Sequence, residues 1–225
     1  MNERMEQAFD KIPFYQKHPY MKPFVGERYE SPKHNKLVII GESHYLPANS
    51  TIHLDIDKWY KGECSPTDEE KEWCHTRNAR LYGYGNFFQQ PIEKDLKERF
   101  AADFGDVASF NYFLRPANKG RSFKKLCTKT DRSFAAKNLK QVLDILEPNL
   151  IVFASFFVFD CAAWKDDFPP ENGEKFEEYA RRRNIKFKIT NHPSRGWWHK
   201  PFHKEGKTSQ QIFIDFLQQN WFCKD

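Results

Sequence analysis

Two apolar runs that end abruptly in polar residues constrain this chain more than any other feature. The first spans residues 37–45 (LVIIGESHY) and the second spans residues 186–194 (KFKITNHPS). Both have the apolar, β-branched character that is typical of strands. In an open parallel sheet, ligands bind at the carboxyl ends of the strands. We therefore expect the carboxylate of Glu42 and the imidazole of His192 to meet across one cleft.

Strand and helix signals alternate along the chain. The apolar patterns predict strands at 37–41, 107–113, 150–155 and 185–190. Helices are predicted from a cap at Ser65, at 87–100, from a cap at Ser133 to Pro148, at 172–183 and from Thr208 onward. This alternation predicts an α/β fold with three α/β/α layers and a four-stranded parallel core sheet. The strand at 37–41 is expected at the centre of that sheet.

Length and composition predict one globular domain. The chain has 225 residues, enough for one sizeable core, so we expect a single domain at 1–225 with an N-terminal arm at about 1–35. The sequence shows no signal peptide and no run of 18 apolar residues that could span a membrane. Five scattered cysteines without a C-x-x-C pair indicate reduced thiols. We therefore expect a cytoplasmic protein without an iron–sulfur cluster, a structural zinc or another cofactor.

Basic residues are concentrated in two segments. Residues 111–140 hold nine basic side chains against one acid, and residues 181–207 again hold nine against one. Two basic segments on one molecule suit a polyanionic partner such as nucleic acid. A solvated surface on a mildly basic protein explains the same charges, so the charge pattern alone leaves both interpretations open.

Three motifs follow predicted strands in a fixed order. They are Gly41-Glu42, then Asn111 followed by Arg115-Pro116, and then His192-Pro193-Ser194. In this order and spacing, over about residues 36–217, the chain resembles the uracil-DNA glycosylase superfamily. The similarity is greatest to the branch with Gly-Glu in its first motif. Two departures stand out: residues 43–45 (SHY) replace the usual Pro and Gly, and the cysteines lack the spacing of that branch's iron–sulfur ligands.

The resemblance implies roles for several residues. Glu42 would be the carboxylate that steadies the oxocarbenium-like sugar or activates water, and His192 would stabilise the anionic leaving base. Asn111 would read the flipped base through its amide. His44 is either an additional base-binding group or a loop residue. The aromatic residue that stacks on the base is not determined, and the candidates are Tyr45, Tyr82, Tyr84 and Phe87.

A loop with two tryptophans follows the His-Pro-Ser motif. In the resembled family this loop carries an apolar wedge that enters the duplex. The residues predicted to contact nucleic acid are Ser194, Arg195, Trp197 and Trp198 in this loop, with Arg115, Lys124 and Lys125 from the first basic segment. The alternative is that one or both tryptophans close the cleft or pack on the N-terminal arm. DNA is thus the expected partner, and no membrane is expected.

The expected function is that of a divergent DNA-repair glycosylase. It would hydrolyse the N-glycosidic bond of a flipped, deaminated or damaged base. One alternative is a catalytically inactive or altered protein that binds nucleic acid or nucleotides on the same fold. A second is a serine hydrolase with Ser43 as its nucleophile, although Ile189 occupies the position where the triad acid would precede His192. Simpler structural roles remain open for the three main residues: a salt-bridged Glu42, a strand-capping Asn111 and a packed turn histidine at His192.

Overall fold

A five-stranded mixed sheet forms the centre of the protein. The computed structural model describes residues 3–81, 86–165, 173–193, 196–201 and 206–223. The strands are β1 (Phe24–Val25), β2 (Leu37–Leu46), β3 (Val107–Asn118), β4 (Leu150–Phe153) and β5 (Lys186–Ile189). Their order across the sheet is β1-β3-β2-β4-β5. β2, β3, β4 and β5 run parallel to one another, whereas β1 pairs antiparallel with β3.

The sheet corrects one prediction and confirms another. The predicted sheet had four parallel strands, and the structure adds the two-residue antiparallel strand β1 at one edge. That strand belongs to the N-terminal arm, where proline and aromatic residues hide any strand periodicity. The prediction that the strand beginning at Leu37 lies centrally is confirmed, because β2 has two strands on each side.

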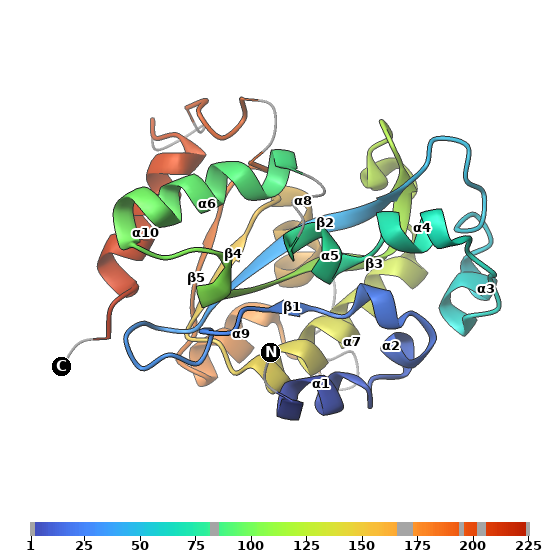
Figure 1. Cartoon of the computed structure of the whole chain (residues 1–225), viewed down its shortest axis with the longest axis horizontal. Helices are drawn as coiled ribbons and strands as arrows, with labels where there is room; N and C mark the ends of the chain where they lie inside the picture. Colours follow the sequence, from blue (N-terminus) through green and yellow to red (C-terminus); the bar gives the residue numbers. More distant parts are fainter. Residues whose placement is uncertain (1–2, 82–85, 166–172, 194–195, 202–205, 224–225) are drawn as a thin grey trace.

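Helices cover both faces of the sheet (Figure 1). The α-helices are α1 (Glu3–Phe9), α2 (Pro13–Lys17), α3 (Ile56–Lys61), α4 (Asp68–Trp73), α5 (Thr76–Leu81), α6 (Asn86–Phe100), α7 (Lys129–Leu146), α8 (Phe156–Asp160), α9 (Phe176–Arg182) and α10 (Ser209–Asn220). Short 3₁₀ turns are η1 (Pro19–Met21), η2 (Phe104–Asp106) and η3 (Phe123–Lys125), and α8 continues into a π-helical turn, η4 (Cys161–Lys165).

Alternating side chains of β2 divide the core into two apolar clusters. Val38 and Ile40 pack with the cluster that includes residues of α1, α7 and α9. Leu37 and Ile39 pack with the opposite cluster, which includes residues of α6 and α10. All four side chains are fully buried. Period-two alternation in a strand that is covered on both faces produces this division. Among the described residues, every helix is too short or too polar to cross a membrane.

Several helix boundaries differ from the predicted ones because other residues provide the caps. α7 is capped by Thr128, whose hydroxyl accepts from Asp131 N, so the helix begins before the predicted cap Ser133. α4 is likewise capped by Thr67 rather than Ser65. The predicted start of the last helix at Thr208 is confirmed, because Thr208 and Gln211 form a capping box at the beginning of α10. Each of these caps satisfies an N–H group that the first helical turn leaves without a partner.

Candidate active site

Four polar residues lie at the level of the sheet where β4 and β5 end. Ser155 and His192 follow β4 and β5, whereas Glu42 and Asn111 lie inside β2 and β3, which continue beyond this level. In register, Gly41 of β2 lies beside Asn111 of β3, and Ile40 lies beside Phe153 of β4. Phe153 in turn lies beside Ile189 of β5. Glu42, Asn111, Ser155 and His192 therefore come from the same edge of the sheet, and we call these four residues the strand-end site. Carboxyl ends of parallel strands are where open α/β sheets bind ligands.

Glu42 is a half-buried carboxylate held by a helix cap. Its Oε2 accepts a 2.9 Å hydrogen bond from the hydroxyl of Ser155, which is the N-cap residue of α8. Burial raises the pKa of Glu42, whereas the Ser155 hydrogen bond and the positive charge of Lys124 oppose that rise in the pKa. A carboxylate with a raised pKa is a better proton acceptor near neutral pH than a fully solvated one.

His192 is a largely buried imidazole packed on an aromatic ring. Its ring centroid lies 5.3 Å from that of Phe88 in α6. Burial, together with the positive charge of Arg80, lowers the pKa of His192 to about 4. The imidazole is therefore neutral at pH 7. A neutral imidazole can donate one N–H hydrogen bond to a developing oxyanion without first losing a proton.

The side chain of Asn111 in β3 lies against Gly41 of the neighbouring strand β2. A Cβ atom at Gly41 would lie 2.3 Å from Asn111 Oδ1 and 3.4 Å from Cε2 of Phe88. The missing side chain at Gly41 thus leaves room for the Asn111 amide beside the strand. Phe88 contacts His192 as well, so this ring connects the Gly41–Asn111 position with the imidazole. The structure thus gives Asn111 and His192 a shared neighbour.

His44 is a buried residue with an assigned hydrogen bond. Its Nε2 lies 3.0 Å from Oγ1 of Thr76, and the Thr76 hydroxyl donates to the carbonyl of Met21. The hydroxyl proton is therefore used, so Nε2–H of His44 is the donor of this pair. Burial, together with the positive charges of Arg80 and His75, lowers the pKa of His44 to about 3. These contacts tie His44 to helix α5 and to residues before β1. Tyr45, the other predicted base-binding residue, is 40% exposed at the end of β2.

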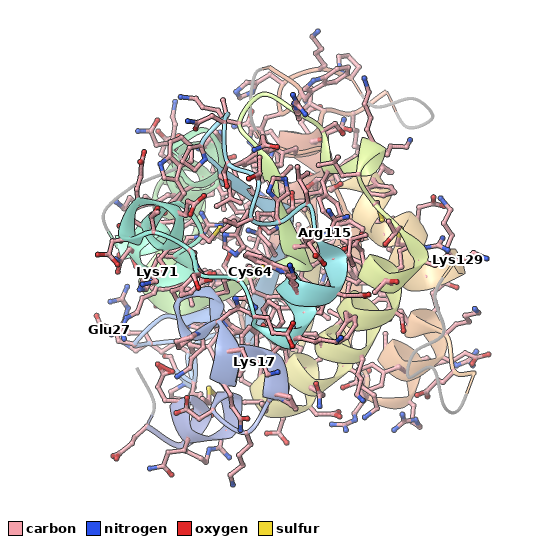
Figure 2. The ribbon with its side chains drawn as sticks, turned by 90° about the vertical axis from the view of Figure 1, so that its right-hand side faces the viewer. Lys17, Glu27, Cys64, Lys71, Arg115 and Lys129 are labelled. Carbon is pink, nitrogen blue, oxygen red and sulfur yellow. The ribbon has the colours of Figure 1, made fainter. Side chains whose placement is uncertain are left out.

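Two predicted nucleic-acid contacts lie in the core instead. Arg115 is 2% exposed, and its Nε and Nη2 donate to the two carboxylate oxygens of Asp131 at 2.7 and 2.6 Å. Figure 2 shows Arg115 within the body of the domain, close to α3. Trp198 is 1% exposed, and its Nε1 donates to Asp95 at 2.9 Å. A buried side chain with a buried partner is not available to a phosphate or a base, so these two predictions are corrected.

The remaining predicted contacts are exposed or lie outside the described residues. Lys124 and Lys125 are exposed on η3, which follows the carboxyl end of β3. Trp197 is 55% exposed, and Lys200 Nζ lies 4.9 Å from its ring centroid. Four other candidates lie outside the described residues, namely Ser194, Arg195, Tyr82 and Tyr84. The side chain of Phe87 also lies outside the described part of the chain.

The second basic segment is divided between the two edges of the sheet. Arg182 and Arg183 at the end of α9 pair with Glu174 and Asp144 respectively. α9 leads into the amino end of β5, so these two arginines lie at the edge opposite the strand-end site. The basic groups near the site therefore come from η3 and from the loop at 196–201.

Sequence reasoning missed three residues of this region. Ser155 carries a detectable signal, because a Ser between an apolar strand and an aromatic-rich helix is a typical N-cap. Phe88 carries only the signal of an apolar residue in the helix predicted at 87–100. Arg80 carries no local signal, because its importance depends on burial by segments that are distant in sequence.

All five cysteines are free thiols. Cys64 donates its S–H to the carbonyl of Ile52, and Cys74 donates to that of Tyr45. Within the described ranges, no group of three or more His, Cys, Asp or Glu side chains converges as a metal ion would require.

Comparison with known proteins does not assign a function to the strand-end site. No known family model matches this chain, and no similar protein was found among curated sequences. A functional assignment therefore depends on the geometry of the residues described above.

Proposed function

We propose that this protein is a divergent uracil-DNA glycosylase-like enzyme that hydrolyses the N-glycosidic bond of a flipped, deaminated or damaged base in DNA. The observation that carries the proposal is the strand-end site itself. A half-buried carboxylate lies in the central strand, the Asn111 amide lies over Gly41 on the opposite face of that strand, and a neutral imidazole packs on Phe88, the ring next to Gly41.

The chemistry of each group suits glycosidic hydrolysis. Cleavage leaves positive charge on the sugar and negative charge on the base. Glu42 would steady the sugar cation or accept a proton from the attacking water. His192 would donate a hydrogen bond to an oxygen of the departing base, where charge develops. Asn111 would use its amide donor and acceptor to read the edge of the base.

The exposed groups around the site suit a DNA backbone. Lys124 and Lys125 on η3 present positive charge beside the end of β3. Trp197 is an exposed aromatic side chain on the loop after β5, next to Lys200. Lysines contact phosphates without regard to sequence, and an exposed indole can stack on or wedge between bases.

Two alternatives differ in what the site residues do. The serine-hydrolase alternative needs a base that activates Ser43. Ser43 is buried, and its Oγ has no hydrogen-bond partner in the part of the chain that the structure describes. Nothing there activates Ser43, which argues against this alternative. The second alternative, binding of nucleic acid without cleavage, uses the same surface and is separated from the proposal by assay.

The test is a cleavage assay with defined lesions. Duplex and single-stranded oligonucleotides that carry uracil, hypoxanthine or xanthine are incubated with the protein, and abasic sites are then broken with alkali. Glu42→Gln and His192→Ala should each lower the single-turnover rate by roughly 10²–10³ while binding is nearly unchanged. Asn111→Asp should instead damage base recognition, because its acceptors repel a pyrimidine carbonyl.

A matched control uses the same residue type away from the site. Glu98→Gln on α6 changes an exposed carboxylate. It should not alter the rate. Tight DNA binding with no cleavage of any lesion would favour the non-catalytic alternative. Wild-type cleavage by His192→Ala would overturn the assigned mechanism.

A further inference from the structure

Arg80 is a buried cation on the helix that precedes α6. It lies on α5 and is only 8% exposed. Its Nε donates a 3.3 Å hydrogen bond to the hydroxyl of Ser109 in β3. Among the described residues, no Asp or Glu forms an ion pair with it. Buried charges are normally paired, because removing a charge from water is costly.

Of the side chains that the structure describes, two aromatic rings, rather than a carboxylate, lie next to the guanidinium of Arg80. Its Cζ lies 4.5 Å from the ring centroid of Phe88 and 5.7 Å from that of Phe104. Rings attract a cation through their electron-rich faces, but they do not neutralise its charge. Burial lowers the pKa of Arg80 to about 10, so the group stays protonated at pH 7. The positive charge therefore remains available to an incoming anion.

The position of Arg80 connects it with the strand-end site. Its partner Ser109 lies two residues before Asn111 in β3, and side chains two apart point to the same face of a sheet. Phe88 contacts both the Arg80 guanidinium and the His192 imidazole. Arg80 thus lies below the proposed base reader and close to the proposed anion stabiliser.

We propose that Arg80 supplies the positive charge of an anion subsite next to Asn111 and His192, and that this subsite takes the anionic nucleobase released on cleavage. The identity of the ligand rests on the proposed function. In that reaction the bond between C1′ and the base nitrogen breaks, and its electron pair leaves with the base. Water adds its oxygen to C1′ and gives a proton to Glu42, and the base anion later takes a proton from solvent. His192 is neutral, so it can donate a hydrogen bond but brings no charge to balance the anion.

Depth favours a base over a phosphate as the occupant. In base flipping only the base enters the pocket, and the sugar–phosphate backbone stays outside. Arg80 is buried beneath the strand ends, whereas Lys124 and Lys125 are exposed where a backbone would run. The buried guanidinium thus suits the part of the nucleotide that goes deepest.

The experiment compares three probes by calorimetric titration of the full chain. Barbiturate is a pyrimidine ring that is anionic at neutral pH, uracil is a neutral ring of the same size, and inorganic phosphate is an anion without a ring. The wild-type protein should bind barbiturate more tightly than uracil. Arg80→Gln should lose about 10- to 100-fold in barbiturate affinity with little change for uracil. Arg80→Lys should keep part of the preference, and Arg28→Gln, at an exposed arginine outside the site, should keep all of it.

Any of four results would overturn the proposal of an anion subsite at Arg80. Such outcomes are equal affinities of the wild-type protein for barbiturate and uracil, equal losses for both in Arg80→Gln, no binding of barbiturate, or Arg80-dependent binding of phosphate alone. The wild-type comparison needs no variant, so it holds even if Arg80→Gln fails to fold. Failure of the proposed function is a separate result: no lesion is cleaved, although barbiturate binding still depends on Arg80.

Discussion

The hydroxyl of Ser155 donates a 2.9 Å hydrogen bond to the carboxylate of Glu42. The hydroxyl oxygen of Ser155 also accepts a hydrogen bond from the backbone N–H of Val158 and so caps α8. One side chain therefore fixes the first turn of a helix and orients the carboxylate of Glu42 in the central strand. A change at Ser155 should affect both the stability of the protein and the proton affinity of the site.

Ser155→Ala should move the acidic limb of the rate–pH profile to higher pH. The Ser155 hydrogen bond lowers the pKa of Glu42 against the effect of burial, so its loss raises that pKa further. The active carboxylate then forms only at higher pH. Loss of the cap should also cost about 1 kcal/mol in the free energy of unfolding. Single-turnover rates between pH 4 and 8 test this, with Ser155→Thr as the conservative control. An unchanged limb in Ser155→Ala would contradict the assigned role.

The protein should lose stability as the pH falls from 6.5 to 4. Burial lowers the pKa of His192 to about 4 and that of His44 to about 3, whereas an unfolded histidine titrates near 6.5. Between these values the unfolded chain binds more protons, so acid favours unfolding. At about 1.4 kcal/mol per pKa unit, His192 alone accounts for about 3 kcal/mol. Urea unfolding across this pH range should show the slope, and His44→Gln or His192→Gln should reduce it. His199→Gln is the matched control, and equal slopes in all proteins would refute the prediction.

The adjacent residues Trp197 and Trp198 should respond differently to alanine. Trp198→Ala should lower the free energy of unfolding by about 3–5 kcal/mol, because it removes a buried indole and its hydrogen bond to Asp95. Trp197→Ala should leave stability within about 0.5 kcal/mol, because the indole is exposed. It should weaken duplex DNA binding by about tenfold and single-strand binding less. Thermal unfolding and fluorescence anisotropy measure the two effects. Equal loss of duplex and single-strand binding would rule out a wedge.

Basic residues of the first segment should separate into a structural group and a binding group. Arg115→Ala should cost about 3–5 kcal/mol in the free energy of unfolding, because it leaves Asp131 buried and uncompensated. Charge reversal of Lys124 and Lys125 should instead spare stability and weaken binding of all DNA sequences. The slope of log affinity against log salt should fall by about 0.9 for each phosphate that the variant no longer neutralises. Lys33→Glu, in the exposed part of the N-terminal arm, is the control. A slope that charge reversal leaves unchanged would exclude η3 from the DNA surface.

The main features of the sheet could be predicted from sequence because they depend on local periodicity. The run at 37–41 is apolar on both faces and is central, and polar residues begin where its neighbour β4 and the next strand, β5, end. β1 could not be predicted in this way. It is two residues long, and it is a strand only because β3 offers unpaired backbone groups beside it.

The predictions for individual side chains depended on contacts that are distant in sequence. Arg115 followed a strand and had the charge of a phosphate ligand, but Asp131 neutralises it in the interior. Trp197 and Trp198 are adjacent and have the same local sequence. Only the packing of the folded protein determines that Trp198, and not Trp197, faces Asp95. Burial of this kind is set by tertiary packing, which a single sequence does not reveal.

The N-terminal arm has a consequence for association between copies of this chain. Phe24 and Val25 occupy part of the outer backbone edge of β3, and at the other side of the sheet β5 carries Lys186 and Lys188. Short strands and lysines are two ways in which sheets avoid pairing with the edges of other molecules. Removal of residues 1–35 would uncover the backbone edge of β3 at Ala108 and Ser109 as a template for edge-to-edge pairing. The arm thus protects the domain against aggregation as well as covering its core.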